Sequence, residues 1–165
     1  MKTETRKIVM ASMLAALCCV ATMIIKIPSP LKGYINLGDS IVLLSGWLLT
    51  PVYGFFAAGI GSALADVFSG YLIYAPVTFV IKGIMAVIVY FCHRAMQSKI
   101  GSTPSRIIGG GFAEIVMILG YFVFEGFLYG FIPSVVNIPA NAVQGIAGII
   151  TGALLVKVFE KTKIF

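Results

Sequence analysis

The sequence predicts an all-α membrane protein, a single bundle of six transmembrane helices with both termini in the cytoplasm. Hydrophobic residues make up 59% of its 165 residues and charged residues 11%, whereas about a quarter of an ordinary soluble domain is charged. Mean hydropathy is +1.03, and so little polar surface cannot cover a soluble core. At roughly 27 residues for a span and its loop, the length accommodates about six spans. We therefore expect no separate soluble catalytic domain.

The distribution of basic residues predicts the topology. A net charge of +6 could indicate a nucleic-acid partner, but in a membrane protein it is explained by positively charged cytoplasmic loops. With six spans and both ends inside, the outer segments hold only Lys26 and Lys32. The inner segments hold nine basic residues, namely Lys2, Arg6, Lys7, Arg94, Lys99, Arg106, Lys157, Lys161 and Lys163. This bias predicts a multi-pass protein of the cell membrane.

The expected domain covers residues 1–165, with helices at about 8–25, 39–50, 52–69, 76–93, 105–129 and 134–158. No small-x-small cleavage site follows the first apolar run, which favours a retained helix over a signal peptide. The segment from Lys26 to Gly38 contains Pro28, Pro30 and Gly33, and these predict an irregular loop.

The second helix is expected to have Asp39 as its N-cap and to be short, because Thr50 and Pro51 end it. The third is rich in glycine and alanine, which allow helix backbones to approach closely in lipid. Pro76 lies in the first turn of the fourth helix, where proline is tolerated.

The polar, basic stretch from His93 to Arg106 predicts a loop between the fourth and fifth helices. The sixth helix is expected to begin after Pro133 and to contain Pro139. The basic tail begins at Lys157.

Four ionisable residues fall within expected spans, where such residues are costly and indicate function. Asp66 and Lys82 have similar depths, because the turn between their helices centres near Ile73. We expect them to form an ion pair, as a structural clamp between two helices or with one of them facing a ligand. Glu114 lies deeper, and pairing with Arg106 or a role in helix packing is expected for it.

The fourth residue, Glu125, is expected in the outer half of the fifth helix, near Tyr121. Asn137, Asn141 and Gln144 follow at positions i, i+4 and i+7, which form one helical stripe. Such a stripe must face protein or water. Either hydrogen bonds between helices or a polar pocket open to the outside accounts for it, and its shared depth with Asp66 and Glu125 favours the pocket. Tyr34, Tyr71 and Tyr74 could form aromatic walls or an interfacial tyrosine belt.

Enzyme chemistry has little support in the sequence. The single histidine, His93, is expected at the membrane interface, and one histidine cannot build a catalytic triad or a metal centre. Cys18, Cys19 and Cys92 are expected to be buried thiols without a redox role. We expect no metal and no cofactor. The sequence has no Walker A motif, so energy for transport would have to come from another subunit.

Several stretches resemble the substrate-binding S components of energy-coupling factor (ECF) vitamin transporters, within the subgroup assigned to hydroxymethylpyrimidine or vitamin B6 and often labelled riboflavin-type. They are Asn36-Leu-Gly-Asp39, Leu49-Thr-Pro51-Val-Tyr-Gly54, Ala57-Ala-Gly59-Ile-Gly61-Ser-Ala63-Leu-Ala-Asp66, Ser69-Gly70-Tyr71, Tyr74-Ala-Pro76 and Ile81-Lys82-Gly83. Length, number of spans and basic ends agree along the whole chain. The resemblance implies an ECF S-component-like bundle.

The resemblance also implies a mechanism. An S component captures a vitamin at the outer face, joins a transmembrane coupling protein and two cytoplasmic ATPase subunits, and is thought to topple in the bilayer to release the vitamin inward. The segment from Lys26 to Gly38 would act as a lid. The family's Ala-x-x-x-Ala docking signature corresponds to Ala11 and Ala15.

Combining both lines, we expect the substrate to be bound by Asn36, Asp66, Tyr74, Lys82, Tyr121, Glu125, Asn137, Asn141 and Gln144. Pyridoxine-type compounds, hydroxymethylpyrimidine, riboflavin and pantothenate remain open as substrates. The alternative is an autonomous secondary carrier or channel that uses the buried Asp, Glu and Lys side chains as an ion relay.

Overall fold

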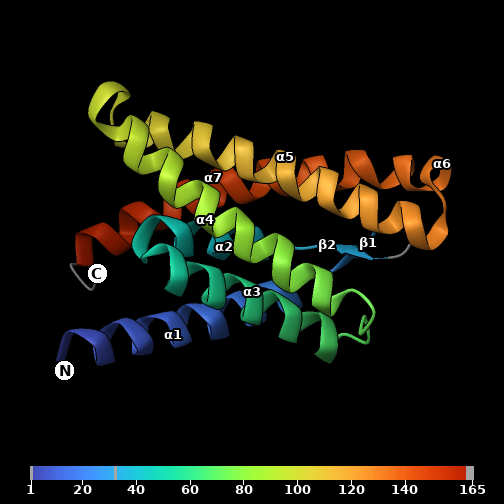
Figure 1. Cartoon of the computed structure of the whole chain (residues 1–165), viewed down its shortest axis with the longest axis horizontal. Helices are drawn as coiled ribbons and strands as arrows, with labels where there is room; N and C mark the ends of the chain where they lie inside the picture. The colour runs from blue at the N-terminus through green and yellow to red at the C-terminus, as the bar shows by residue number, and fades with distance from the viewer. Residues whose placement is uncertain (1, 32, 163–165) are drawn as a thin grey trace.

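A computed structural model describes residues 2–31 and 33–162 and confirms the all-helical class. Figure 1 shows long helices side by side, with a short hairpin at one end of the bundle. The elements are α1 (Lys2–Ile24), β1 (Ile27–Pro28), β2 (Tyr34–Ile35), α2 (Gly38–Leu48), α3 (Pro51–Phe68), α4 (Ala75–Ile100), α5 (Ser102–Tyr129), α6 (Phe131–Ser134), η1 (Val135–Asn137) and α7 (Ile138–Thr162).

Five helices in the described part of the chain are long and apolar enough to cross a membrane, and α2 is a sixth, shorter apolar helix. The chain passes back and forth, so that α1 begins and α7 ends at the same end of the bundle (Figure 1). We call this the terminal end. The β1–β2 hairpin and the α3–α4 turn lie at the opposite end (Figure 1), which we call the cavity end.

Helix α2 is the centre of the bundle. Every residue from Gly38 to Trp47 is buried, and the helix contacts α1, α3, α4 and α7. A helix that is apolar on all sides is stable only when it is enclosed by others. Close approach to α4 requires Gly46, because a Cβ there would lie 2.4 Å from the Ala86 carbonyl oxygen.

The expected loop from His93 to Arg106 is wrong. Helix α4 continues to Ile100, α5 starts at Ser102, and only Gly101 separates them, with φ at 87°. Polar residues such as Gln97 and Lys99 favour helix outside the apolar zone, so low hydropathy there does not mean irregular backbone. The expected sixth helix is divided into α6, η1 and α7, with Pro139 in the first turn of α7.

Asp39 is not the N-cap of α2. Leu37 occupies that position, and no side chain caps the helix. Asp39 lies inside the first turn and is completely buried. Its carboxylate is therefore used in tertiary contacts within the bundle.

Candidate functional site: a polar cavity beneath a lid

A cavity opens at the cavity end, between the loop after α1 and helices α3, α4, α5 and α7. With its open mouth it measures about 430 Å³. Its lining is polar and aromatic, and consists of Ser29, Gly33, Tyr34, Asn36, Asp66, Tyr71, Tyr74, Thr78, Tyr121, Glu125, Asn137, Asn141 and Gln144. Eight of the nine side chains predicted to bind substrate are in this set; Lys82 is not.

The segment of residues 26–37 covers the cavity, and we call it the lid; residue 32 within it lies outside the described residues. Its two short strands pair antiparallel, with Ile27 opposite Ile35. Tyr34 donates a hydrogen bond through its hydroxyl to Asp66 Oδ1 at 2.7 Å. Burial, with the Asp66 carboxylate beside it, raises the pKa of Tyr34 above its usual range. The Tyr34 hydroxyl therefore remains a donor across the physiological pH range.

The middle and the C-terminal end of the lid are held by side chains of η1 and α7. Leu31 N donates to Asn137 Oδ1 at 3.1 Å, and Asn36 N donates to Gln144 Oε1 at 2.9 Å. At the edge of the lid, Lys26 Nζ donates to Ser69 Oγ at 2.7 Å.

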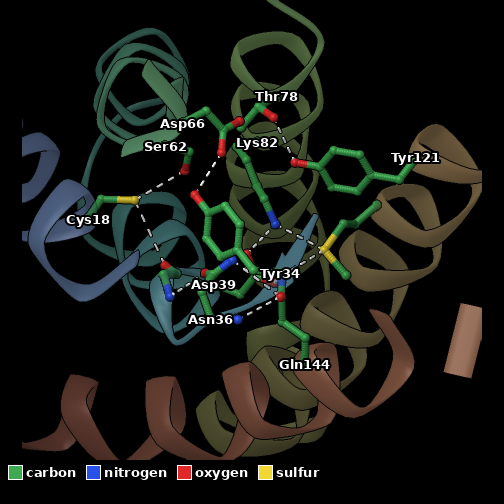
Figure 2. A network of polar contacts seen from close by, with 12 residues as sticks. Cys18, Tyr34, Asn36, Asp39, Ser62, Asp66, Thr78, Lys82, Tyr121 and Gln144 are labelled. Atoms are coloured by element: carbon green, nitrogen blue, oxygen red, sulfur yellow. Dashed lines mark hydrogen bonds and ion pairs between the residues drawn. The ribbon is translucent and has the colours of Figure 1, made fainter. Parts of the chain in front are cut away.

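A buried ion pair lies beneath the cavity (Figure 2). Lys82 pairs with Asp39 rather than with Asp66, so the predicted Asp66–Lys82 pair is wrong. Lys82 Nζ also contacts Met117 Sδ at 2.9 Å, and Gln144 Nε2 donates to Asp39 Oδ2 at 2.7 Å. Two residues at equal depth in the membrane are not necessarily neighbours, because depth does not say which helices face each other. Lys82 on α4 faces the enclosed helix α2, whose acidic residue is Asp39.

Several carboxylate, hydroxyl and amide groups that line the cavity are hydrogen-bonded to one another. Glu125 accepts two hydrogen bonds from Asn137 Nδ2, at 2.9 and 3.0 Å. Tyr74 donates its hydroxyl to Glu125 Oε1 at 3.4 Å. The hydroxyls of Thr78 and Tyr121 are 3.0 Å apart. Asp66 Oδ2 is buried without a hydrogen bond to any described residue.

Aromatic rings form one wall of the cavity. The ring centroids of Tyr34 and Tyr71 are 5.0 Å apart, and those of Tyr71 and Tyr74 are 6.1 Å apart. Phe124 supports Tyr74 from behind, with centroids 5.3 Å apart. Flat faces beside hydrogen-bonding groups suit a planar heteroaromatic ring.

The remaining polar residues expected from the sequence lie away from the cavity. Arg106 pairs with Glu160 at 2.5 Å rather than with Glu114. Both carboxyl oxygens of Glu114 are buried without a hydrogen bond to a described residue. The side chain packs against α7, since a Cβ on Gly145 would lie 2.9 Å from Glu114 Oε2.

His93 is buried within the bundle, and its Nδ1 lies 2.7 Å from Ser105 Oγ. Cys18 and Cys19 are buried thiols, while Cys92 is only partly buried. Among the described residues, no group of three or more His, Cys, Asp or Glu side chains could hold a metal ion.

A second concave surface lies between α1 and α3 on the side of the bundle. We call it the α1–α3 groove. It is apolar, and its lining consists of Ile8, Ala11, Ser12, Ala15, Ala16, Tyr53, Phe56, Ala57, Ile60 and Leu64. Ala11 and Ala15 thus share one surface, with small side chains that leave it shallow.

Sequence reasoning missed Asp39, Tyr34 and Thr78 as parts of this polar network. For Tyr34 the sequence predicts an aromatic wall or a place in an interfacial tyrosine belt, and not a hydrogen bond to Asp66. The sequence feature that could have identified the ion pair is Asp39. It is the one acidic residue of a short, mainly apolar helix, and a buried carboxylate there needs a buried cation. Lys82 is the basic residue at the centre of a predicted span.

Comparisons with known proteins agree with this architecture. Residues 2–161 match a family model described as "ECF-type riboflavin transporter, S component". A Pyrococcus woesei protein, "Uncharacterized protein in gap 3'region", is 39% identical over 143 residues, which cover 86% of this chain and 93% of that protein.

A solved structure described as "Structure and mechanism of the S component of a bacterial ECF transporter" is 27% identical, with a TM-score of 0.72. The match covers 96% of this chain and 98% of that chain. The chain is a multi-pass membrane protein and not an enzyme. It belongs to the family of substrate-binding S components of ECF transporters.

Proposed function

We propose that this S component captures a small vitamin or vitamin precursor with a single heteroaromatic ring, of the pyridoxine or hydroxymethylpyrimidine type. The observation that carries the proposal is the composition of the cavity. Tyr34, Tyr71 and Tyr74 offer ring faces, while Asp66 and Asn141 offer hydrogen-bonding atoms. A ring with hydroxyl or amino substituents would stack on the first set and donate to the second.

The volume of the cavity also favours a small ligand. Its 430 Å³ includes the open mouth, so the space enclosed beneath the lid is smaller than this. Riboflavin carries three fused rings and a ribityl chain, and would require the lid to move away. Because the matching family model is described as riboflavin-type, riboflavin is the essential comparison ligand.

We place the cavity on the outer side of the membrane and both termini in the cytoplasm. Arg94 and Lys99 lie in the last two turns of α4 and Lys157 in the last two turns of α7, and both helices end at the terminal end (Figure 1). An excess of basic residues indicates the cytoplasmic side. Substrate would then enter from outside beneath the lid.

The α1–α3 groove is the proposed docking surface for the transmembrane coupling protein. Ala11 and Ala15 keep it shallow, and Phe56 and Ile60 supply apolar walls. Helices associate in lipid by close packing at such small residues. Two cytoplasmic ATPase subunits would supply the energy through that coupling protein.

Calorimetric titration of the purified protein with pyridoxine, hydroxymethylpyrimidine and riboflavin tests the substrate class. We expect one single-ring compound to bind one-to-one and at least tenfold more tightly than riboflavin. Tighter binding of riboflavin would overturn the proposal.

The autonomous carrier makes a different prediction. Vesicles that contain only this chain should not accumulate the bound compound, whereas vesicles that also contain the coupling protein and ATPases should accumulate it when ATP is supplied. Gradient-driven uptake by the chain alone would favour the carrier.

A further inference from the structure

Three carboxamide side chains lie in one stripe along η1 and α7, and they differ in their hydrogen bonds. Asn137 ends η1, and Asn141 and Gln144 follow on α7. All three line the cavity. Asn137 and Gln144 each connect a carboxylate on one side to a backbone N–H of the lid on the other.

Gln144 joins the buried ion pair to the end of the lid (Figure 2). Its Nε2 donates to Asp39 Oδ2 at 2.7 Å, and its Oε1 accepts from Asn36 N at 2.9 Å. A carboxylate can only accept hydrogen bonds and a backbone N–H can only donate. The amide therefore has one satisfied orientation, and the Asp39–Lys82 pair holds it there.

Asn137 repeats this arrangement at the middle of the lid, between its two strands. Its Nδ2 donates to both oxygens of Glu125, at 2.9 and 3.0 Å, and its Oδ1 accepts from Leu31 N at 3.1 Å. Asn137 is 2% exposed and Glu125 3% exposed, so water does not replace these bonds in the structure. Again a carboxylate sets the direction in which the amide oxygen points.

Asn141 lies between these two residues and differs from both. It is partly buried and lines the cavity. Its side chain makes no hydrogen bond to any residue that the structure describes. Its amide can both donate and accept, so it suits a ring substituent or ring nitrogen.

We propose that Asn137 and Gln144 are positioning residues that fasten the middle and the C-terminal end of the lid, each oriented by a buried carboxylate, and that Asn141 is the carboxamide of the stripe that contacts substrate. The assignment of Asn141 rests on the proposed function. The two lid fastenings do not, because they are present without a ligand. Asp39 and Lys82 thereby act on the lid without touching the cavity.

Hydrogen–deuterium exchange of the ligand-free protein, read by mass spectrometry on lid peptides, tests the fastenings. Gln144→Met keeps the size of the side chain and removes the acceptor. We expect it to speed exchange of the Asn36 amide roughly tenfold, as for loss of one hydrogen bond, and to leave Leu31 unchanged. Asn137→Leu should do the reverse. Asn141→Leu is the matched control and should change neither amide.

The orienting role of the carboxylate is tested with Glu125. Glu125→Met removes the acceptor of the Asn137 amide, so exchange at Leu31 should rise several-fold although Glu125 does not touch Leu31. Glu125→Gln retains a carbonyl acceptor and should restore most of the protection. Equal exchange at Leu31 in Glu125→Met and the wild type would overturn the orienting role.

If the variants inside the bundle fail to fold, a variant in the lid itself can still test the fastening by Asn137. Leu31→Pro removes the N–H donor on the lid side of the same bond. Exchange of the Ser29 N–H, which donates to the Gly33 carbonyl within the lid, should rise. Loosening of the lid by Asn141→Leu to the same extent as by Gln144→Met would overturn the division of tasks. If exchange behaves as expected but pyridoxine and hydroxymethylpyrimidine fail to bind, the substrate class is wrong and the fastenings stand.

Discussion

The cavity and the α1–α3 groove are built from opposite kinds of residue. In the cavity, carboxylates, carboxamides and tyrosines are joined by hydrogen bonds that link the lid to α3, η1 and α7, and η1 to α5. The groove is lined by alanines and apolar side chains, and α1 approaches α3 so closely that a Cβ on Gly61 would lie 2.4 Å from the Ala15 carbonyl oxygen. Recognition of a polar ligand needs directional partners shielded from lipid, whereas docking to an apolar helix needs a flat surface. The two regions should therefore fail independently.

The largest expected effect separates docking from binding. Ala11→Trp combined with Ala15→Trp fills the groove and should abolish co-purification with the coupling protein, while calorimetric titration with the identified vitamin remains unchanged. Leu119→Trp introduces the same ring at an exposed position on α5 and serves as the control. Normal assembly of the double variant would mean that the partner docks elsewhere.

The next largest effect concerns the ion pair beneath the cavity. Lys82→Met leaves Asp39 buried without its cation, and breaking such a pair costs about 3–5 kcal/mol. Thermal unfolding in detergent should show a clear loss of stability. Adding Asp39→Asn removes the remaining buried charge, so the double variant should recover most of the stability that Lys82→Met loses. A double variant as unstable as Lys82→Met alone would contradict a pairing role.

A ten- to hundredfold loss of affinity is expected for Asn141→Leu, because a ligand group left without its hydrogen bond costs about 1–3 kcal/mol. Titration with pyridoxine or hydroxymethylpyrimidine measures it, and assembly with the coupling protein should be normal. Gln97→Leu makes the same chemical change on an exposed side chain near the terminal end. Unchanged affinity in Asn141→Leu would place the ligand elsewhere.

The smallest effect concerns packing behind the groove. Gly61→Ala forces α1 away from α3 and should destabilise by about 1–3 kcal/mol. Gly111→Ala is the matched helical control, because a Cβ there would meet nothing within 4 Å, and it should be neutral or stabilising by up to about 1 kcal/mol. Thermal unfolding compares the two. Equal stability of both variants would mean that the α1–α3 contact is loose.

Much of the architecture could be predicted because the bilayer imposes it. Apolar segments of suitable length mark the long helices, and Pro28, Pro30 and Gly33 mark the irregular lid. The 3.6-residue period brings Asn137, Asn141 and Gln144 to one cavity. These inferences need only local sequence and the thickness of the membrane.

Lateral arrangement could not be predicted in the same way. Depth places Asp66 and Lys82 at one level, but the enclosed position of α2 brings Asp39 to Lys82 instead. Composition also does not predict the backbone at the terminal end, because a polar helix and a polar loop have similar hydropathy. The continuation of α4 to Ile100, and the contact of His93 with Ser105, therefore could not be read from the sequence. Which partner a polar group meets depends on how the helices pack around α2.

The most direct test of a polar cavity that captures a single-ring vitamin is mass spectrometry of the small molecule that co-purifies with the protein. The wild-type chain should carry one pyridine- or pyrimidine-type vitamin or precursor in close to equimolar amount. The same preparation of Asn141→Leu should carry little or none, although it still assembles with the coupling protein. Riboflavin in the wild-type sample, or equal occupancy of both proteins, would contradict the account.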